Sequence, residues 1–195
     1  MTSDAARLAI FASGNGTNAE AIIQHFQHHP SIKVSLLVSN NPEAKAIERA
    51  NRLGVETNIF TKKQFRESDE IINALGKYCI SHIGLAGFLL QIPPGLIYAF
   101  PKRIINIHPS LLPKFGGKGM YGMKVHEAVK VAEETETGIT IHEVNEEYDE
   151  GKIIFQASCH VEKTDSPEII AQKIHQLEHE HYPKVIEQWI ISKDH

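Results

Sequence analysis

Hydrophobic residues along the first hundred positions fall into short runs that alternate between strand-like and helix-like spacing. Residues 7–12 (RLAIFA) form an apolar run, and residues 19–26 then carry apolar side chains at helical spacing. The same alternation continues, and it predicts strands at 32–38, 55–60, 80–86 and 103–107, and helices at 44–53, 68–78 and after the proline pair at 93–94. Strands that alternate with helices predict a parallel sheet.

The pattern changes after residue 110. Residues 111–122 hold four glycines and one proline and follow neither period, which indicates a functional loop. Alternation at 138–143 and 153–160 predicts an antiparallel hairpin, and Ser166 followed by Pro167 opens a long helix that Pro183 interrupts without ending. We therefore expect a three-layer α/β fold: a mostly parallel, twisted, Rossmann-like sheet with helices on both faces, a C-terminal antiparallel hairpin and a long terminal helix.

Composition indicates an ordinary globular protein that folds around its own core. The chain has 195 residues, of which 42% are hydrophobic and 23% charged, so we expect one domain over 1–195. The net charge of −4 argues against broad attraction to nucleic acid or to an anionic membrane. No apolar run approaches membrane-spanning length and residues 1–6 are polar or small, which predicts a cytoplasmic protein. Cys79 and Cys159 are interpreted as packing residues.

A glycine loop follows the first predicted strand. Residues 14–19 (GNGTNA) fit a GxGxx(G/A) pattern, whose backbone N–H groups converge on an anion at the start of a helix. A dinucleotide site would need an acidic residue at the end of the second strand, and residues 39–41 (SNN) provide none. A lone phosphate therefore fits better than a dinucleotide, and a tight turn without a ligand stays open as an alternative.

Candidate catalytic groups follow a buried strand near the carboxyl edge of the sheet. Alternation puts Asn106 and His108 on the same side, where an amide and an imidazole would suit a carbonyl oxygen that becomes an oxyanion. A strand-end histidine satisfied by the backbone is the plainer alternative. Asp149 lies in the polar connection 145–151, and if it folds over His108 it should raise the pKa of that imidazole. A solvated turn is equally compatible with this acidic connection.

The spacing of histidines and glycines bears on metal binding and on nucleotide hydrolysis. His175 and His179 are four residues apart with Glu178 between them, but no HExxH motif and no third ligand follow from the sequence, so no metal is expected. The histidines at 25, 28 and 29 are interpreted as a solvated helix end. No GxxxxGK[ST] motif is present, which excludes the P-loop NTPases.

Five segments together resemble the phosphoribosylglycinamide formyltransferase family: SGNGTN at 13–18, AGF at 86–88, NIHPSLLPKF at 106–115, YDEGKIIFQ at 148–156 and EHEHYP at 178–183. NIHPSLLP also marks the wider group of enzymes that use 10-formyltetrahydrofolate, which includes methionyl-tRNA formyltransferase and formyltetrahydrofolate deformylase. The glycine loop resembles that of the purine enzyme, and the other two enzymes carry a further domain.

The resemblance implies formyl transfer from 10-formyltetrahydrofolate, as co-substrate, to the amine of glycinamide ribonucleotide in purine biosynthesis, by a monomer or homodimer without a metal. It implies that Asn106, His108 and Asp149 are catalytic, with His108 protonated through Asp149. Residues 1–100 would then form a phosphate-binding half and residues 101–195 a folate-binding and catalytic half. The implied substrate-binding residues are Asn15, Gly16, Thr17, Asn18 and Glu178, and the implied folate-binding residues are Lys62, Leu89, Leu90, Gln91, Ile92, Asn106, Val144, Glu147 and Tyr148.

Three departures from the family pattern bear on the folate site. Leu89 and Leu90 stand where the family often has Met-Arg, and Lys62 stands where an arginine commonly contacts the folate, which keeps the charge but loses bidentate geometry. Residues 115–123 (FGGKGMYGM) are longer and richer in glycine than the commoner version. A deformylase and a folate- or nucleotide-binding module without activity stay open as alternative functions.

Overall fold

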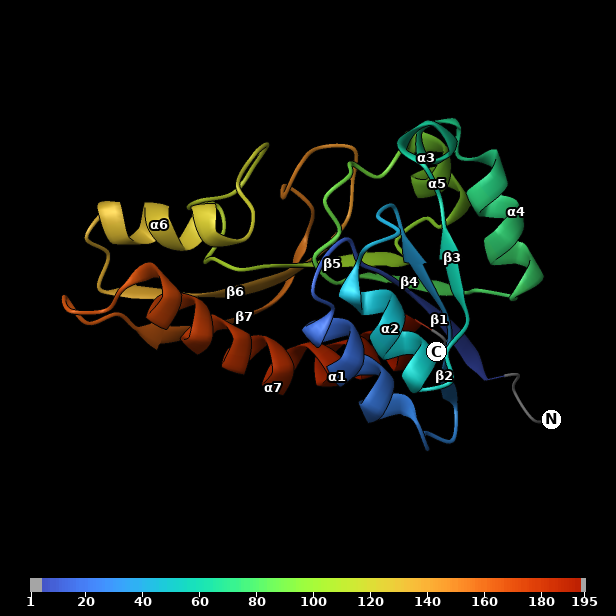
Figure 1. The fold of residues 1–195 in the computed structure, drawn as a ribbon, viewed down its shortest axis with the longest axis horizontal. Helices are drawn as coiled ribbons and strands as arrows, with labels where there is room; N and C mark the ends of the chain where they lie inside the picture. The colour runs from blue at the N-terminus through green and yellow to red at the C-terminus, as the bar shows by residue number, and fades with distance from the viewer. Residues whose placement is uncertain (1–4, 194–195) are drawn as a thin grey trace.

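A seven-stranded sheet forms the centre of the computed structural model, which describes residues 5–193 (Figure 1). The strand order is β3-β2-β1-β4-β5-β6-β7. The first five strands in sequence pair in parallel, whereas β6 and β7 pair antiparallel to their neighbours. The bounds are β1 Ala6–Phe11, β2 Ile32–Ser39, β3 Thr57–Ile59, β4 His82–Leu85, β5 Ile104–His108, β6 Glu136–Glu143 and β7 Ile153–His160.

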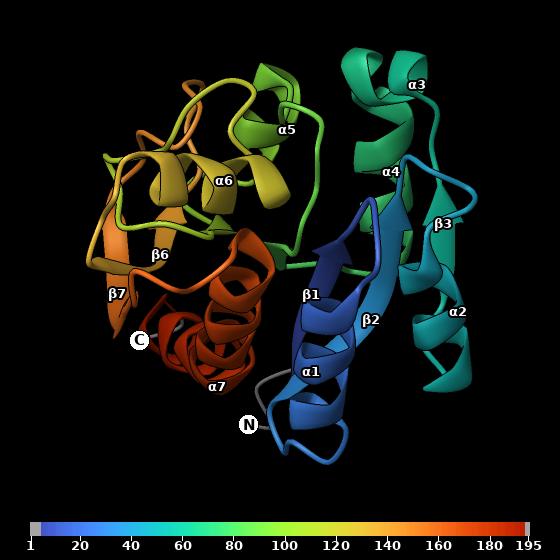
Figure 2. The ribbon, with the colours of Figure 1, turned by 60° about the vertical axis from the view of Figure 1, so that its left-hand side comes forward.

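Helices cover both faces of this sheet. One face carries α1 Thr17–Phe26, α2 Lys45–Arg52, α6 Met123–Val131 and α7 Pro167–Lys193. The other carries α3 Lys62–Glu67, α4 Asp69–Lys77 and α5 Pro94–Ala99. Figure 2 shows the long helix α7 beside α1, in front of the sheet. None of the helices within residues 5–193 is both long and apolar enough to cross a membrane.

The apolar run of β1 explains why the sheet is buried on both sides. Successive side chains of a strand point to opposite faces. Leu8 and Ile10 enter the core beneath α1, α2 and α7, whereas Ala9 and Phe11 enter the core beneath α3, α4 and α5. All four are fully buried, so a polar residue at any of them would lose its hydrogen bonds with water.

The predicted fold class is confirmed, including the antiparallel hairpin and the long terminal helix that continues through Pro183. Two helices, α3 and α6, were not predicted. The sequence does carry a start for α3, because Thr61 and Gln64 form a reciprocal capping box. The helix is only six residues long, too short for an apolar period to stand out.

The sheet brings three strand ends together. Phe11 pairs with Leu85 in register, and Leu85 pairs with Asn106, so β1, β4 and β5 end side by side. Neighbouring strands lie about 4.8 Å apart, which puts Phe11, just before the glycine loop, about 10 Å from Asn106. Ligands of open α/β sheets bind at this carboxyl edge.

Candidate active site

A cavity of about 640 Å³ opens at this edge of the sheet. Its lining comes from the glycine loop, the segment after β4, the end of β5, the 117–122 loop, the 144–149 connection and helix α7. The structure brings to it every residue that we expect to be catalytic, substrate-binding or folate-binding, except Lys62, which begins α3 outside the cavity. Those that line it are Asn15, Gly16, Thr17, Asn18, Leu89, Leu90, Gln91, Ile92, Asn106, His108, Val144, Glu147, Tyr148, Asp149 and Glu178.

The glycine loop presents the start of helix α1 to the cavity. Gly16 is the N-cap and adopts a left-handed conformation with φ of 76°, and no side chain caps the helix there. A Cβ on Gly16 would lie 2.4 Å from the Cα of Ala46, so both the conformation and the close approach require glycine. The first N–H groups of α1 are therefore free to meet an anion, which the helix dipole also favours.

Glu178 closes this end of the cavity from helix α7. Its side chain is 6% exposed, and its Oε2 accepts a hydrogen bond of 2.9 Å from Nδ2 of Asn18. Burial raises the pKa of Glu178 to about 7, against the opposing effect of the Asn18 hydrogen bond. Glu178 can therefore change its charge near neutral pH.

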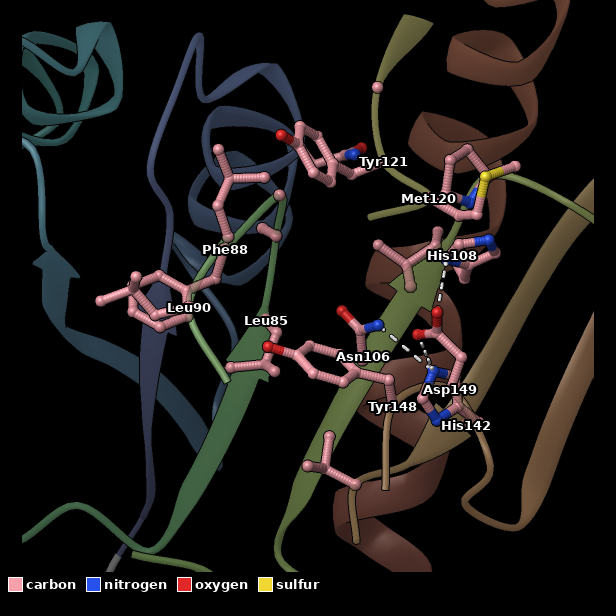
Figure 3. Close-up of a pocket in the computed structure, with 18 of the residues that line it drawn as sticks. Leu85, Phe88, Leu90, Asn106, His108, Met120, Tyr121, His142, Tyr148 and Asp149 are labelled. Carbon is pink, nitrogen blue, oxygen red and sulfur yellow. Dashed lines mark hydrogen bonds and ion pairs between the residues drawn. The ribbon is translucent and has the colours of Figure 1, made fainter. Parts of the chain in front are cut away.

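At the other end, Asn106, His108 and Asp149 converge as Figure 3 shows. His108 is 4% exposed, and its Nδ1 lies 3.4 Å from Oδ2 of Asp149. Its Nε2 lies 2.8 Å from the carbonyl oxygen of Phe115. Asp149 adopts a positive φ of 58°, and its Oδ2 also accepts a hydrogen bond of 2.9 Å from the N–H of Gly117. Backbone strain of this kind concentrates at functional sites.

The expected protonation of His108 needs a correction. Burial lowers the pKa of His108 below its usual value, and the neighbouring His142 acts in the same direction. Asp149 and the Phe115 carbonyl raise this pKa, as the sequence predicted for Asp149, but they do not outweigh burial. In the protein without a ligand, the net effect of its surroundings is therefore to lower the pKa of His108, opposite to the direction that the ion pair alone predicts.

Asp149 itself is held as a carboxylate. Burial opposes its charge, but the nearby His142 ring, the proximity of His108 and the hydrogen bond from the Gly117 N–H together lower its pKa. A negative charge thus stays next to His108, ready to stabilise the imidazolium if a reaction step favours that form.

Sequence reasoning missed His142. This buried side chain lies opposite Asn106 in the pairing of β5 with β6. Its Nε2 lies 3.2 Å from Nδ2 of Asn106 and 3.6 Å from Oδ1 of Asp149, and its Nδ1 is 2.9 Å from the carbonyl oxygen of Glu143. With the proton on Nδ1, His142 donates to that carbonyl and accepts from the Asn106 amide. The predicted hairpin placed His142 on a strand, but only its register against the neighbouring strand shows the contact.

His126 of helix α6 was missed as well. It lines the cavity and is 3% exposed, and its Nδ1 has no hydrogen-bond partner among residues 5–193. Burial lowers its pKa to about 4, with smaller effects of His175 and His108. A neutral imidazole therefore lines the cavity. The helix that carries it was not predicted, so its position could not be read from the sequence.

Apolar side chains form the remaining wall of the cavity. Figure 3 shows Phe88 and Leu90 on one side and Tyr148 facing them from the other. Gln91 donates to the carbonyl oxygen of Glu146 at 2.9 Å, which joins the segment after β4 to the 144–149 connection. This part of the site fits a flat, largely apolar ligand.

The histidine-rich segments assemble no metal centre in the part of the chain that is described. Between residues 5 and 193 no group of three or more His, Cys, Asp or Glu side chains is placed to hold a metal ion. His175 and His179 stack instead, with ring centroids 6.4 Å apart, and His25 pairs with Glu187 at 2.6 Å.

Comparison with known proteins agrees with this architecture. The formyl transferase family model matches residues 6–186. Phosphoribosylglycinamide formyltransferase of Bacillus subtilis (strain 168) is 40% identical over 187 residues, which cover 93% of each chain. The chloroplastic phosphoribosylglycinamide formyltransferase of Arabidopsis thaliana is 42% identical over 186 residues, and the match covers 92% of this chain but 64% of that longer protein.

A solved structure shows the same fold. The crystal structure of phosphoribosylglycinamide formyltransferase from Bacillus Halodurans superposes with a TM-score of 0.86, at 37% identity and 97% coverage of both chains. The identity and the shared fold extend over nearly the whole chain. This protein therefore belongs to the formyl transferase family, in its phosphoribosylglycinamide formyltransferase branch.

Proposed function

We propose that this enzyme transfers the formyl group of 10-formyltetrahydrofolate to the amine of glycinamide ribonucleotide, a step of purine biosynthesis. The observation that carries the proposal is the composition of one cavity. It joins an anion-binding helix start at Asn15–Asn18 to a buried amide, imidazole and carboxylate at Asn106, His108 and Asp149. A phosphorylated amine fits the first end and an acyl transfer fits the second.

The ribonucleotide would bind with its phosphate on the glycine loop. Free N–H groups at the start of α1 and the helix dipole favour a dianion there. Glu178 lies beside Asn18 and would contact the ribose or glycinamide part. This arrangement directs the amine from the phosphate end toward Asn106 and His108.

The formyl donor would enter along the apolar wall. Leu90, Ile92, Val144 and Tyr148 would enclose its pteridine ring, and backbone groups of 90–92 would supply hydrogen bonds. Replacement of the commoner arginine by Leu90 leaves Lys118 as the one lysine or arginine that lines the cavity among the described residues. The glutamate tail of the folate would therefore find fewer positive charges than the family pattern supplies.

The reaction would be a direct acyl transfer. The amine nitrogen forms a bond to the formyl carbon, the bond from that carbon to N10 of the folate breaks, and a proton passes from the amine to N10. Asn106 would donate an N–H to the developing oxyanion. Burial keeps the His108 imidazole neutral despite Asp149, but the negative charge that develops on the formyl oxygen would add to that of Asp149. His108 would then take up a proton and stabilise the same oxygen by its positive charge.

Product analysis tests the proposal. The purified protein is incubated with 10-formyltetrahydrofolate and glycinamide ribonucleotide, and the products are identified by mass spectrometry. The proposal predicts the formylated ribonucleotide and tetrahydrofolate in equal amounts. Formate and tetrahydrofolate formed without the ribonucleotide would instead identify a deformylase, and binding of both compounds without turnover would identify a binding module.

A further inference from the structure

Helix α2 packs directly on the glycine loop (Figure 1). The N–H of Ala46 donates a 3.2 Å hydrogen bond to the carbonyl oxygen of Gly14, and Gly16 approaches Ala46 so closely that a Cβ would not fit. The loop that faces the cavity therefore rests on α2, whose own residues do not line the cavity.

Arg49 extends this support to the residue at the tip of the loop. Its Nε donates to the carbonyl oxygen of Asn15 at 2.9 Å, and its Nη2 donates to Oδ1 of the same residue at 3.2 Å. One guanidinium thus fixes both the backbone and the side chain of Asn15. A planar group with several donors is suited to such paired contacts, whereas an ammonium group is not.

Glu20 of helix α1 holds the guanidinium in place. Its two carboxylate oxygens pair with Arg49 and with Arg52. Two arginines against one carboxylate leave a net positive charge behind the loop. The side chain of Arg49 is 26% exposed, compared with 65% for Arg52, so the pair that touches Asn15 is the better shielded from solvent.

We propose that Arg49 is a positioning residue for the phosphate of the substrate. By fixing Asn15 from behind, it keeps the N–H groups of residues 15–18 directed at the anion, and it adds a positive charge on the far side of the loop. Arg49 acts through Asn15, because it does not itself line the cavity. The inference rests on the proposed function, since the phosphate is that of glycinamide ribonucleotide.

Arg52 provides a matched control, because it pairs with the same carboxylate but, within residues 5–193, forms no hydrogen bond with the loop. The experiment measures kcat and KM for both substrates in the wild type, Arg49→Met, Arg49→Lys and Arg52→Met. It also compares glycinamide ribonucleotide with glycinamide riboside, which lacks the phosphate. Thermal unfolding of each variant reports on folding separately.

Arg49→Met should raise KM for the ribonucleotide by about tenfold to a hundredfold, as expected for loss of hydrogen bonds from a charged donor. The KM for the formyl donor should stay within about twofold, and the preference for the ribonucleotide over the riboside should shrink by the same factor as the KM change. Arg49→Lys should fall between wild type and Arg49→Met, because it keeps the charge without the paired geometry. Arg52→Met should match the wild type.

Two results would overturn the inference while the wild type is active. One is an equal increase of the KM for the ribonucleotide in Arg49→Met and Arg52→Met, which would show that Arg49 contributes only to the packing of α2. The other is an unchanged preference for the ribonucleotide over the riboside in Arg49→Met. A wild type that turns over no formyl donor with the ribonucleotide would overturn the proposed function itself, and the two failures are thereby distinguishable.

Discussion

His142 and Asn106 face each other across the β5–β6 pair, with Nε2 of the imidazole 3.2 Å from Nδ2 of the amide. The same Nε2 lies 3.6 Å from Asp149. One buried side chain therefore contacts two of the three residues proposed to act on the formyl group. The antiparallel strand β6 supplies a fourth polar group to a site that otherwise comes from β5 and its neighbouring loops.

Replacement of His142 by Phe should lower kcat by about tenfold to a hundredfold. Phe fills similar space but leaves the Asn106 amide without that partner and free to turn away from the oxyanion. The KM for each substrate should change less than kcat. Glu143→Gln is the control, because the neighbouring Glu143 pairs with Lys193 instead. An unchanged kcat in His142→Phe would show that Asn106 is positioned without this contact.

Replacement of Asp149 by Asn should lower the pKa of His108 further. Burial already depresses this pKa, and Asp149 is the neighbouring charge that counteracts it. NMR titration of the His108 ring should show the shift, and the alkaline limb of the kcat profile should move to lower pH in the variant. Glu150→Gln, an exposed position on the same connection that does not line the cavity, should leave both unchanged. Identical titration curves for wild type and Asp149→Asn would contradict the proposed coupling.

Replacement of Glu178 by Gln should stabilise the ligand-free protein at alkaline pH. The folded pKa of about 7 exceeds the ordinary value of 4.5. Between pH 4.5 and about pH 7 the folded state holds a proton that the unfolded state has lost, so the free energy of unfolding falls as pH rises through this range. The total loss is about 3 kcal/mol once the pH is above about 7. Gln removes this dependence. The melting temperature of Glu178→Gln, relative to that of the wild type, should therefore rise between pH 5 and pH 8. The same difference for Glu180→Gln should stay constant. A constant difference for Glu178→Gln as well would rule out a raised pKa.

Replacement of Gly16 by Ala should destabilise the protein by at least about 2 kcal/mol and weaken ribonucleotide binding. The new Cβ would meet Ala46 at 2.4 Å, and the left-handed backbone is also unfavourable for alanine. Gly14→Ala is a matched control for stability, because a Cβ there meets nothing within 4 Å. Chemical denaturation of both variants measures the difference. Equal stabilities would mean that α2 does not hold the loop.

The features that could be predicted from the sequence are those that depend on residues close together in the chain. Apolar runs such as residues 7–12 predicted the buried parallel strands, and the glycine loop predicted a helix start open to an anion. Alternation alone placed Asn106 and His108 on one face of their strand. These properties depend on neighbours in the chain, so they can be predicted without a structure.

Properties that depend on the fold were not predicted. The contact of His142 with Asn106 depends on the β5–β6 register, which places these residues opposite each other. The pKa of His108 depends on how deeply the 115–117 loop buries it, which a neighbouring carboxylate in the sequence does not reveal. Lys62 carries the expected charge, but the turn into α3 places it away from the cavity.

The most direct test of the central claim is an absorbance assay of folate turnover, with and without glycinamide ribonucleotide, on the wild type, Asn106→Ala and His108→Ala. His160→Ala, an exposed histidine on β7, is the control. Turnover should require the ribonucleotide, and kcat should be lower by about a hundredfold or more in both site variants and unchanged in the control. Turnover without the ribonucleotide, or a near-normal kcat in His108→Ala, would contradict the central claim.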